Sequence, residues 1–241
     1  MDAGSVRALN ALNRAFYRLT AAHFDESRGR DWPGWKRLTP ILTALPQPIR
    51  VLDVGCGNGR FGRFLARTLT VPPHYHGMDH TPELLEAARA AFAVMGVLPD
   101  AVLEERDIVE RPPDSGVYDF VGLFGVIHHV PGSAQRRALM AALAERVGPG
   151  GVLAFASWRF MDHARFRERI TAWPDGITQE AGDYVLDWRR GQAALRYCHH
   201  VDDAEQAALE AATGLTLVER FAADGHTGNI NCYSVLRRPS V

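Results

Sequence analysis

The 241-residue sequence has few of the features that mark secreted, zinc-binding or membrane proteins. Its three cysteines, Cys56, Cys198 and Cys232, include no Cys-x-x-Cys pair, so neither a disulfide framework nor a zinc site is indicated. No apolar run approaches the length of about 18 residues that suggests a membrane span, and the N-terminus lacks the apolar core of a signal peptide. We therefore expect a cytoplasmic protein with no resident metal and no membrane partner.

An excess of charge of one sign is also absent, because the formal net charge is −1. Such a balance produces no overall field toward nucleic acid or an anionic membrane. Lys36 is the only lysine among 27 basic residues, and the others are arginine. Arginine suits planar recognition of phosphate or carboxylate, although GC-rich coding bias gives the same composition. The 46% hydrophobic content is enough for a substantial core.

Strand and helix patterns alternate from about residue 49 onward. Apolar strands are expected at 49–55, 74–79, 101–107, 118–129 and 151–158, and a closing pair at 215–221 and 230–238. This alternation predicts a mostly parallel sheet with helices on both faces and a ligand at the carboxyl ends of the strands. We expect one domain over residues 1–241. Within it, residues 1–48 form a helical cap and lid loop, and residues 159–193 form an insertion over the substrate site.

A glycine-rich loop, VLDVGCGNGRFG at 51–62, follows the first strand. Gly55, Gly57 and Gly59 allow backbone conformations that other residues resist and let a ligand approach the main chain. The helix that follows offers unpaired N–H groups to a polar or negative ligand. Because Gly57, Gly59 and Gly62 also satisfy the dinucleotide pattern, the loop alone does not identify the ligand.

Three acids near the ends of successive strands narrow the choice of ligand for this loop. Asp53 would repel a pyrophosphate but hold a cationic ammonium group, Asp79 can accept hydrogen bonds from ribose hydroxyls, and Asp107 can accept from an adenine amino group. Amine, ribose and adenine together describe S-adenosylmethionine. The alternatives are a helix-capping role for Asp53 and an exposed turn for Asp107.

These features resemble the class I S-adenosylmethionine-dependent methyltransferases. The resemblance rests on LDVGCGNG, Asp79, Asp107, YDFVGLFGVIHHV and GPGGVLAF, and runs from about residue 49 to the C-terminus. It implies a Rossmann-like α/β fold with a seven-stranded, mostly parallel sheet and an antiparallel last strand. It also implies a cofactor site formed by Asp53, Gly55, Cys56, Gly57, Asn58, Gly59, Asp79, His80, Asp107, Ile108 and Phe124.

Two histidines, His128 and His129, end the fourth expected strand, where the methyl group meets its acceptor in this fold. Because neighbouring strand residues face opposite sides, we expect at most one of them to contact substrate. A carboxylate acceptor is already ionised at neutral pH, so histidine would orient it. A phenol or amine acceptor must lose a proton, so histidine would act as the base.

A closer resemblance is to the tRNA wobble-uridine carboxyl methyltransferases, which methylate the carboxylate of 5-carboxymethyluridine. It is carried by FYRLTAAHFDESRGRDWPGW at 16–35, VIHHV at 126–130 and LRYCHHVDDAEQAALEAATGLTLVERF at 195–221. It implies functional roles for Arg28 and for one of His128 and His129, a tRNA substrate and, in some members, a small zinc-binding activator protein. Substrate-pocket positions would be Arg196, Tyr197, His199 and Asn231.

The sequence also departs from that family. Asn231, Cys232 and Tyr233 replace a tryptophan-rich strand end, and the chain is not basic. A neutral chain needs a local basic patch to bind phosphates, for which the candidates are Arg159, Arg165, Arg167, Arg169, Arg189, Arg190, Arg196, Arg237 and Arg238. An ordinary solvated face is the alternative. A small-molecule methyltransferase with residues 159–193 as a lid therefore stays open, as does a non-enzymatic cofactor-binding subunit, against which the intact glycine loop argues.

Overall fold

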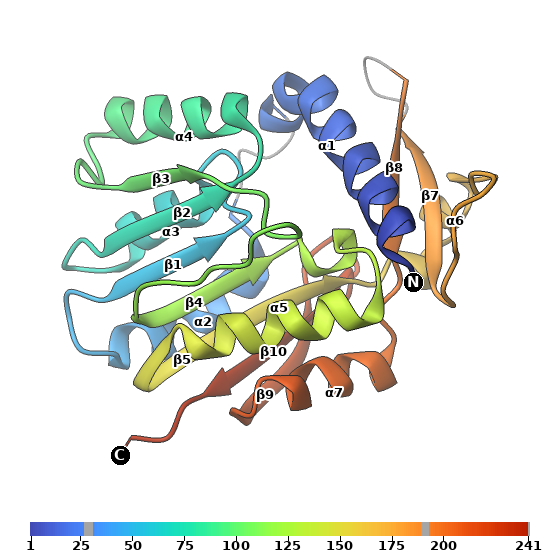
Figure 1. Cartoon of the computed structure of the whole chain (residues 1–241). Coiled ribbons are helices and arrows are strands. Elements are labelled where there is room, and N and C mark those ends of the chain that lie inside the picture. The colour runs from blue at the N-terminus through green and yellow to red at the C-terminus, as the bar shows by residue number, and fades with distance from the viewer. Residues whose placement is uncertain (27–30, 189–192, 241) are drawn as a thin grey trace.

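A seven-stranded sheet forms the centre of the computed structural model, which describes residues 1–26, 31–188 and 193–240, apart from the side chains of 22–26. The five strands of this sheet that come first in the chain are parallel to one another. The strand nearest the C-terminus runs antiparallel to both of its neighbours. The order is β3 (Val102–Glu105), β2 (His74–Asp79), β1 (Arg50–Val54), β4 (Tyr118–Phe124), β5 (Val147–Trp158), β10 (Asn231–Arg237) and β9 (Thr216–Ala223). This confirms the expected fold class (Figure 1).

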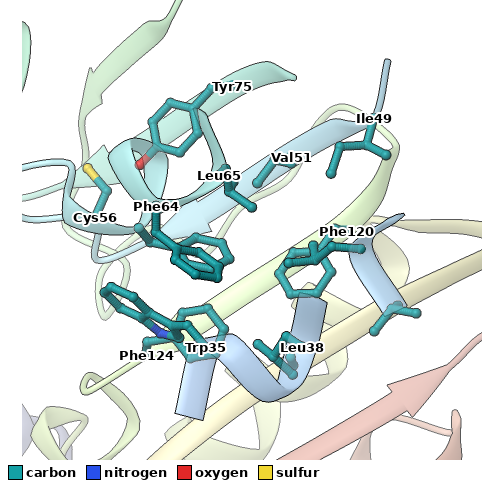
Figure 2. Packing of buried hydrophobic residues seen from close by; sticks show 14 of the residues in the cluster. Trp35, Leu38, Ile49, Val51, Cys56, Phe64, Leu65, Tyr75, Phe120 and Phe124 are labelled. Carbon is teal, nitrogen blue, oxygen red and sulfur yellow. The ribbon is translucent and has the colours of Figure 1, made fainter. Parts of the chain in front are cut away.

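Helices cover both faces of this sheet, as expected for parallel strands with continuous apolar runs. Apolar side chains of α2 (Pro33–Ala44), α3 (Arg60–Thr68) and α4 (Pro82–Met95) pack in one core cluster, and those of α5 (Ser133–Glu145) and α7 (Asp203–Ala212) in another. Figure 2 shows the first cluster. In it the ring centroid of Trp35 lies 5.9 Å from the ring centroid of Phe64 and 5.9 Å from that of Phe124. Cys56 of the glycine loop belongs to this first cluster, which anchors the loop to the core on that face of the sheet.

A second, three-stranded antiparallel sheet lies beside the first. Its order is β6 (Ile170–Thr171), β7 (Asp183–Trp188) and β8 (Ala194–His199), with the short helix α6 (Ala164–Arg167) nearby. The long helix α1 (Ala3–Glu26) packs against β8 and lies beside the ends toward which the parallel strands run (Figure 1). None of the described helices is both long enough and apolar enough to cross a membrane.

The fourth strand is shorter than the expected segment 118–129. β4 ends at Phe124, Gly125 has a φ of +76°, and residues Ile127–His129 form a single 3₁₀ turn, η1. Apolar periodicity does not distinguish a strand from a tight buried turn over so few residues. The two histidines therefore lie on a turn, so strand alternation does not separate their side chains.

Candidate active site

Three adjoining hollows lie at the carboxyl ends of β1, β2 and β4. We name each hollow after one residue that lines it: the Asp79 hollow, the Arg196 hollow and the Asp53 hollow. The Asp79 hollow and the Arg196 hollow share Tyr17, Gly125 and His129. The Asp53 hollow shares Trp32 and Arg60 with the Arg196 hollow, and shares Gly55, Gly57 and Phe124 with the Asp79 hollow. Because neighbouring hollows share wall residues, they lie side by side at the edge of the sheet where parallel α/β folds bind ligands, and we call the three together the cleft.

The glycine loop forms the floor between the Asp53 and Asp79 hollows. The backbone N–H groups of Gly55 and Cys56 both donate to the Met78 carbonyl, at 2.7 and 2.9 Å, which joins the loop to β2. Gly55 has a φ of +73°, and a Cβ there would lie 2.3 Å from a methyl carbon of Val126. Glycine is therefore required by both the backbone conformation and the available space.

Asp79 lies at the end of β2, where the sequence predicts it, and also holds the loop. One carboxylate oxygen accepts from the Gly57 N–H and the other from the Thr81 N–H, both at 2.9 Å. Asp79 also lines its hollow, as does His80. A carboxylate has about four lone-pair directions, so two protein hydrogen bonds leave capacity for ligand hydroxyls.

Asp53 lines the adjacent hollow with Cys56 and Asn58, and it is only 2% exposed. The Tyr75 hydroxyl donates to it at 2.5 Å. Burial raises the pKa of Asp53 to about 7, against the opposing effect of the Tyr75 hydrogen bond. Among the described residues, Asp53 accepts its hydrogen bond from Tyr75 and none from a backbone N–H of the following helix, so it does not have the alternative helix-capping role.

Asp107 follows β3 and lines the Asp79 hollow together with Ile108. One of its carboxylate oxygens accepts from the Val109 N–H at 3.0 Å, and the other accepts from the Asn10 side chain at 2.8 Å. The carboxylate therefore stabilises a turn and also ties α1 to the cleft, a contact that the sequence did not predict.

His128 and His129 lie together, with ring centroids 4.3 Å apart, and both line the Arg196 hollow. The expectation that one of them turns away is therefore wrong. The Nδ1–H of His129 donates to the Tyr197 carbonyl at 3.0 Å, which makes Nε2 the acceptor of the neutral ring, 2.8 Å from the Tyr17 hydroxyl. Nδ1 of His128 accepts from the Trp158 N–H at 3.4 Å.

The four predicted substrate residues divide into two pairs. Arg196 and Asn231 line the cleft, and Asn231 also donates to Asp224 at 2.8 Å. Tyr197 and His199 instead lie in a buried polar network, where each contacts Asp183 at 2.7 Å, and neither lines the three hollows. Strand alternation explains the division between Arg196 and its neighbours, because residues 197 and 199 share the face of β8 opposite to residue 196.

Arg196 is 8% exposed, and aromatic rings surround its guanidinium. That group lies 4.8 Å from the Trp158 ring centroid, 5.3 Å from that of Phe16 and 5.8 Å from that of Trp188. Among the described residues, no carboxylate lies within ion-pair distance of it. The hollow thus contains a buried cation whose contacts are faces of aromatic rings.

Several cleft residues were missed from the sequence. Asn10 and Asn13 of α1 line the Asp79 hollow beside Tyr17, and the i, i+3, i+7 spacing of the three on a helix that is otherwise apolar on one side was a usable signal. Arg60 and Trp158 also line the cleft. Arg28, a predicted functional residue, lies outside the described residues.

The nine candidate arginines do not form one patch in the described part of the chain. Arg237 pairs with Val152 in the middle of β5, whereas Asn231 pairs with Trp158 at its carboxyl end, because β10 runs antiparallel and away from the cleft. Arg159 forms an ion pair with Asp203 at 2.7 Å. Arg165 and Arg167 are exposed on α6, next to Phe166 of the Arg196 hollow, and residues 189 and 190 are not among the described ones.

The cleft residues fit S-adenosylmethionine. Asp79 offers acceptors for ribose hydroxyls, the buried acid Asp53 suits an ammonium group, and the space beside Gly55 admits a ligand against the main chain. The sequence model of a family described as "Methyltransferase domain" matches residues 24–219. The chain belongs to this family: it is a class I S-adenosylmethionine-dependent methyltransferase, an enzyme whose cofactor is S-adenosylmethionine.

Three proteins to which this chain is similar differ in what they methylate. The tRNA (carboxymethyluridine(34)-5-O)-methyltransferase of Saccharomyces cerevisiae is 28% identical over 144 residues, which are 59% of this chain and 46% of that protein. The ubiquinone biosynthesis O-methyltransferase of Pectobacterium atrosepticum is 36% identical over 110 residues, 45% of this chain and 42% of that one. The chain thus spans less than half the length of these two relatives.

The S-adenosylmethionine-bound structure of CalS10, an amino pentose methyltransferase from Micromonospora echinaspora, superposes with a TM-score of 0.62 at 23% identity. It covers 92% of this chain and 98% of its own. This likeness supports the fold and leaves the acceptor open.

Proposed function

We propose that this enzyme is an O-methyltransferase that methylates the carboxylate of a 5-carboxymethyl-type uridine at the wobble position of tRNA. The observation that carries the proposal is the buried guanidinium of Arg196 beside His128 and His129 in the Arg196 hollow. The likeness to the S. cerevisiae tRNA enzyme supports the choice of tRNA.

A buried cation is costly unless a group of opposite charge or hydrogen-bond acceptors compensate it. The aromatic faces around Arg196 compensate in part, and its buried Nε has no hydrogen-bond acceptor within the described structure. A substrate carboxylate in the hollow would supply both a counter-charge and acceptors, in the planar geometry that arginine favours. The Arg196 hollow is therefore electrostatically complementary to a carboxylate.

In the proposed reaction the protein positions its reactants. When bound, S-adenosylmethionine supplies an electrophilic methyl group on its sulfonium. Arg196 holds the acceptor carboxylate, and the paired His128 and His129 rings form the wall beside it, with the His129 tautomer set by the Tyr197 carbonyl. No general base is needed because a carboxylate, with a reference pKa of about 4, is ionised at neutral pH. Correct orientation then supplies much of the rate.

A small-molecule acceptor is the second candidate, and the match to the ubiquinone biosynthesis enzyme favours it. A phenolic acceptor would need a base near the junction of the hollows. Nε2 of His129, which is 2.8 Å from the Tyr17 hydroxyl, is the acceptor nitrogen there. A pH–rate profile with an ascending limb near the histidine pKa would accompany such chemistry.

The test is incubation with methyl-labelled S-adenosylmethionine and total tRNA, followed by nucleoside analysis. We expect label in a uridine methyl ester that mild alkali releases. Arg196→Leu should reduce kcat/KM at least about 100-fold, since it removes a charge-assisted contact, and Arg196→Lys should restore part of the loss. Arg89→Ala on the exposed face of α4, away from the three hollows, is the control and should retain activity within a few fold. Label that resists alkali, or label only in a phenolic acceptor, would refute the proposal.

A further inference from the structure

The Asp53 hollow has an unusual set of ionisable side chains. Among the described residues that line it, Asp53, Cys56 and Arg60 can carry charge. Burial raises the pKa of the Cys56 thiol well above its ordinary value, so the thiol is neutral. One acid and one base therefore remain in the same small, largely aromatic space, whose walls include Trp32, Trp35, Phe61 and Phe124.

Arg60 is the first residue of α3, directly after the glycine loop. Its guanidinium carbon lies 5.1 Å from the ring centroids of both Trp32 and Trp35. Burial lowers its pKa to about 10, which still leaves the group charged at neutral pH. The two indole rings thus hold a cation at the end of the loop where Asp53 also lies.

Asp224, an acid that lines the Arg196 hollow together with Arg60, is already engaged. Its carboxylate accepts from the Gly34 N–H at 2.8 Å, from Asn231 at 2.8 Å and from the Tyr233 hydroxyl at 2.7 Å. Those three donors fill most of its acceptor capacity. Asp224 therefore attracts the Arg60 guanidinium through space while its own hydrogen bonds go to other groups.

We infer that Arg60 binds the α-carboxylate of the methionine part of S-adenosylmethionine, while Asp53 takes the ammonium group of the same amino acid. An α-amino acid carries one group of each sign on the same carbon, and the Asp53 hollow offers one group of the opposite sign for each. Guanidinium and carboxylate form strong charge-assisted hydrogen bonds. The inference rests on the cofactor and is independent of the tRNA proposal.

Arg60 also lines the Arg196 hollow, so binding of an anion on the acceptor is the competing role. Two ligands that differ only in the carboxylate separate these roles: S-adenosylhomocysteine and its decarboxylated analogue, S-adenosyl-3-thiopropylamine. Isothermal titration of each into the full chain needs no acceptor and no turnover. The ratio of their two dissociation constants measures carboxylate recognition within a single protein variant.

Wild type should bind S-adenosylhomocysteine roughly 10- to 100-fold more tightly than the analogue, the range for a hydrogen-bonded charge pair. Arg60→Met, which keeps an apolar stem against the indole rings, should bring that ratio close to one without changing affinity for the analogue, and Arg60→Lys should keep part of the ratio. Arg67→Ala on the same helix, which removes an ion pair with Asp31, is the control and should keep the wild-type ratio.

A ratio near one in wild type, or an unchanged ratio in Arg60→Met, would overturn the inference. If Arg60→Met keeps the ratio but loses turnover, Arg60 acts on the acceptor instead. A circular dichroism melt of each variant confirms folding, and Arg60→Gln replaces any variant that melts early. Failure of tRNA methylation with the ratio behaving as expected would refute only the acceptor assignment.

Discussion

Asp53 and Asp79 end neighbouring strands but have different surroundings. Asp79 accepts hydrogen bonds from two backbone N–H groups, whereas Asp53 is enclosed by apolar side chains and accepts from one phenol. Burial accordingly raises the pKa of Asp53 to about 7. Asp79 therefore shapes the loop, while Asp53 has a charge that the free protein stabilises poorly and a ligand ammonium group would stabilise well.

This gives a prediction for Asp53→Asn. Because the pKa rises from 3.8 to about 7 on folding, the native state retains a proton between these values that the unfolded state releases. The unfolding free energy of wild type thus falls as pH rises across this interval. A neutral amide at this position would avoid the loss, so the variant should be more stable than wild type at pH 8 by an amount on the order of 4 kcal/mol, and about equally stable at pH 3.5.

Urea denaturation of the cofactor-free proteins at the two pH values checks this difference. The same substitution should weaken S-adenosylhomocysteine binding, so stability and affinity move in opposite directions. A variant that is less stable than wild type at pH 8 would contradict the assigned environment of Asp53.

A comparison of Gly55 with Gly176 separates the cost of a left-handed backbone from the cost of a steric clash. Gly55→Ala introduces a Cβ 2.3 Å from Val126 at a φ of +73°, whereas Gly176→Ala has the same φ of +73° with no atom within 4 Å. We expect Gly176→Ala to cost about 1 kcal/mol, from the left-handed backbone alone. Gly55→Ala should cost about 2–4 kcal/mol and weaken cofactor binding. Equal melting temperatures for the two variants would show that the loop relaxes freely.

Helix α1 connects the two sheets through one polar face. Asn10 donates to Asp107 after β3, while Asn13 donates to the His129 carbonyl at 3.1 Å and accepts from the Tyr197 N–H at 2.8 Å. Tyr17 completes the face at His129. The helix thus lines the Asp79 hollow with all three residues, and two of them also bond to the histidine turn.

Asn13→Ala should separate acceptor binding from cofactor binding. It leaves a buried carbonyl and a buried N–H without their partner, which should cost about 2–4 kcal/mol of stability. Because the two hydrogen bonds that are lost lie at η1 and β8, KM for the acceptor should rise by a larger factor than the dissociation constant of S-adenosylhomocysteine, although Asn13 also lines the Asp79 hollow. Asn10→Ala is the matched variant and should instead weaken the cofactor. The reverse pattern in titration and steady-state kinetics would contradict the division.

A buried charge network connects the second sheet to the helices of the first. His199 of β8 bonds to Asp183 of β7 and to Glu205 of α7, and Arg136 of α5 bonds to Glu205 at 2.8 Å and to Glu180 at 3.4 Å. Arg136 is 1% exposed. Since β8 also carries Arg196 and the Tyr197 carbonyl, this network determines where one wall of the cleft lies.

The network predicts a pH window of stability. Burial alone would lower the pKa of His199, but hydrogen bonds to Asp183 and Glu205 raise it above 6.5, and the pKa of Glu205 falls below 4.5 because of His199 and Arg136, against the effect of burial. The His199 contribution is therefore complete below pH 6.5 and lost as pH rises through its folded pKa. The Glu205 contribution is complete above pH 4.5 and lost as pH falls through its folded pKa.

Stability from this network should be greatest between about pH 4.5 and 6.5. His199→Gln should cost about 3 kcal/mol or more at pH 6, since it unpairs buried charges. Its deficit relative to wild type should shrink as pH rises above 6.5. Urea denaturation across pH 4–9 checks this, and a deficit that grows above pH 6.5 would contradict it.

The repeating parts of the fold and the polar strand ends were readable from the chain. The runs at 49–55 and 151–158 are apolar apart from Arg50, Asp53 and a few small residues, which marks strands buried on both faces, and Asp53 and Asp79 stand where such strands end. These signals are local, because hydrophobic period and turn chemistry involve residues a few positions apart. These local signals were enough to predict the seven-stranded sheet, the glycine loop and the cofactor.

The acceptor side of the cleft depended on contacts between distant segments. Tyr17 lies against His129, and Arg196 lies among Phe16, Trp158 and Trp188, because α1, β5, β7 and β8 converge there. Local patterns state which face of an element is apolar but not which element will cover it. For that reason Tyr197 and His199, which were predicted to line the substrate pocket, lie outside the three hollows, and Arg60 was overlooked. Long-range packing selects the side chains that reach a shared cavity.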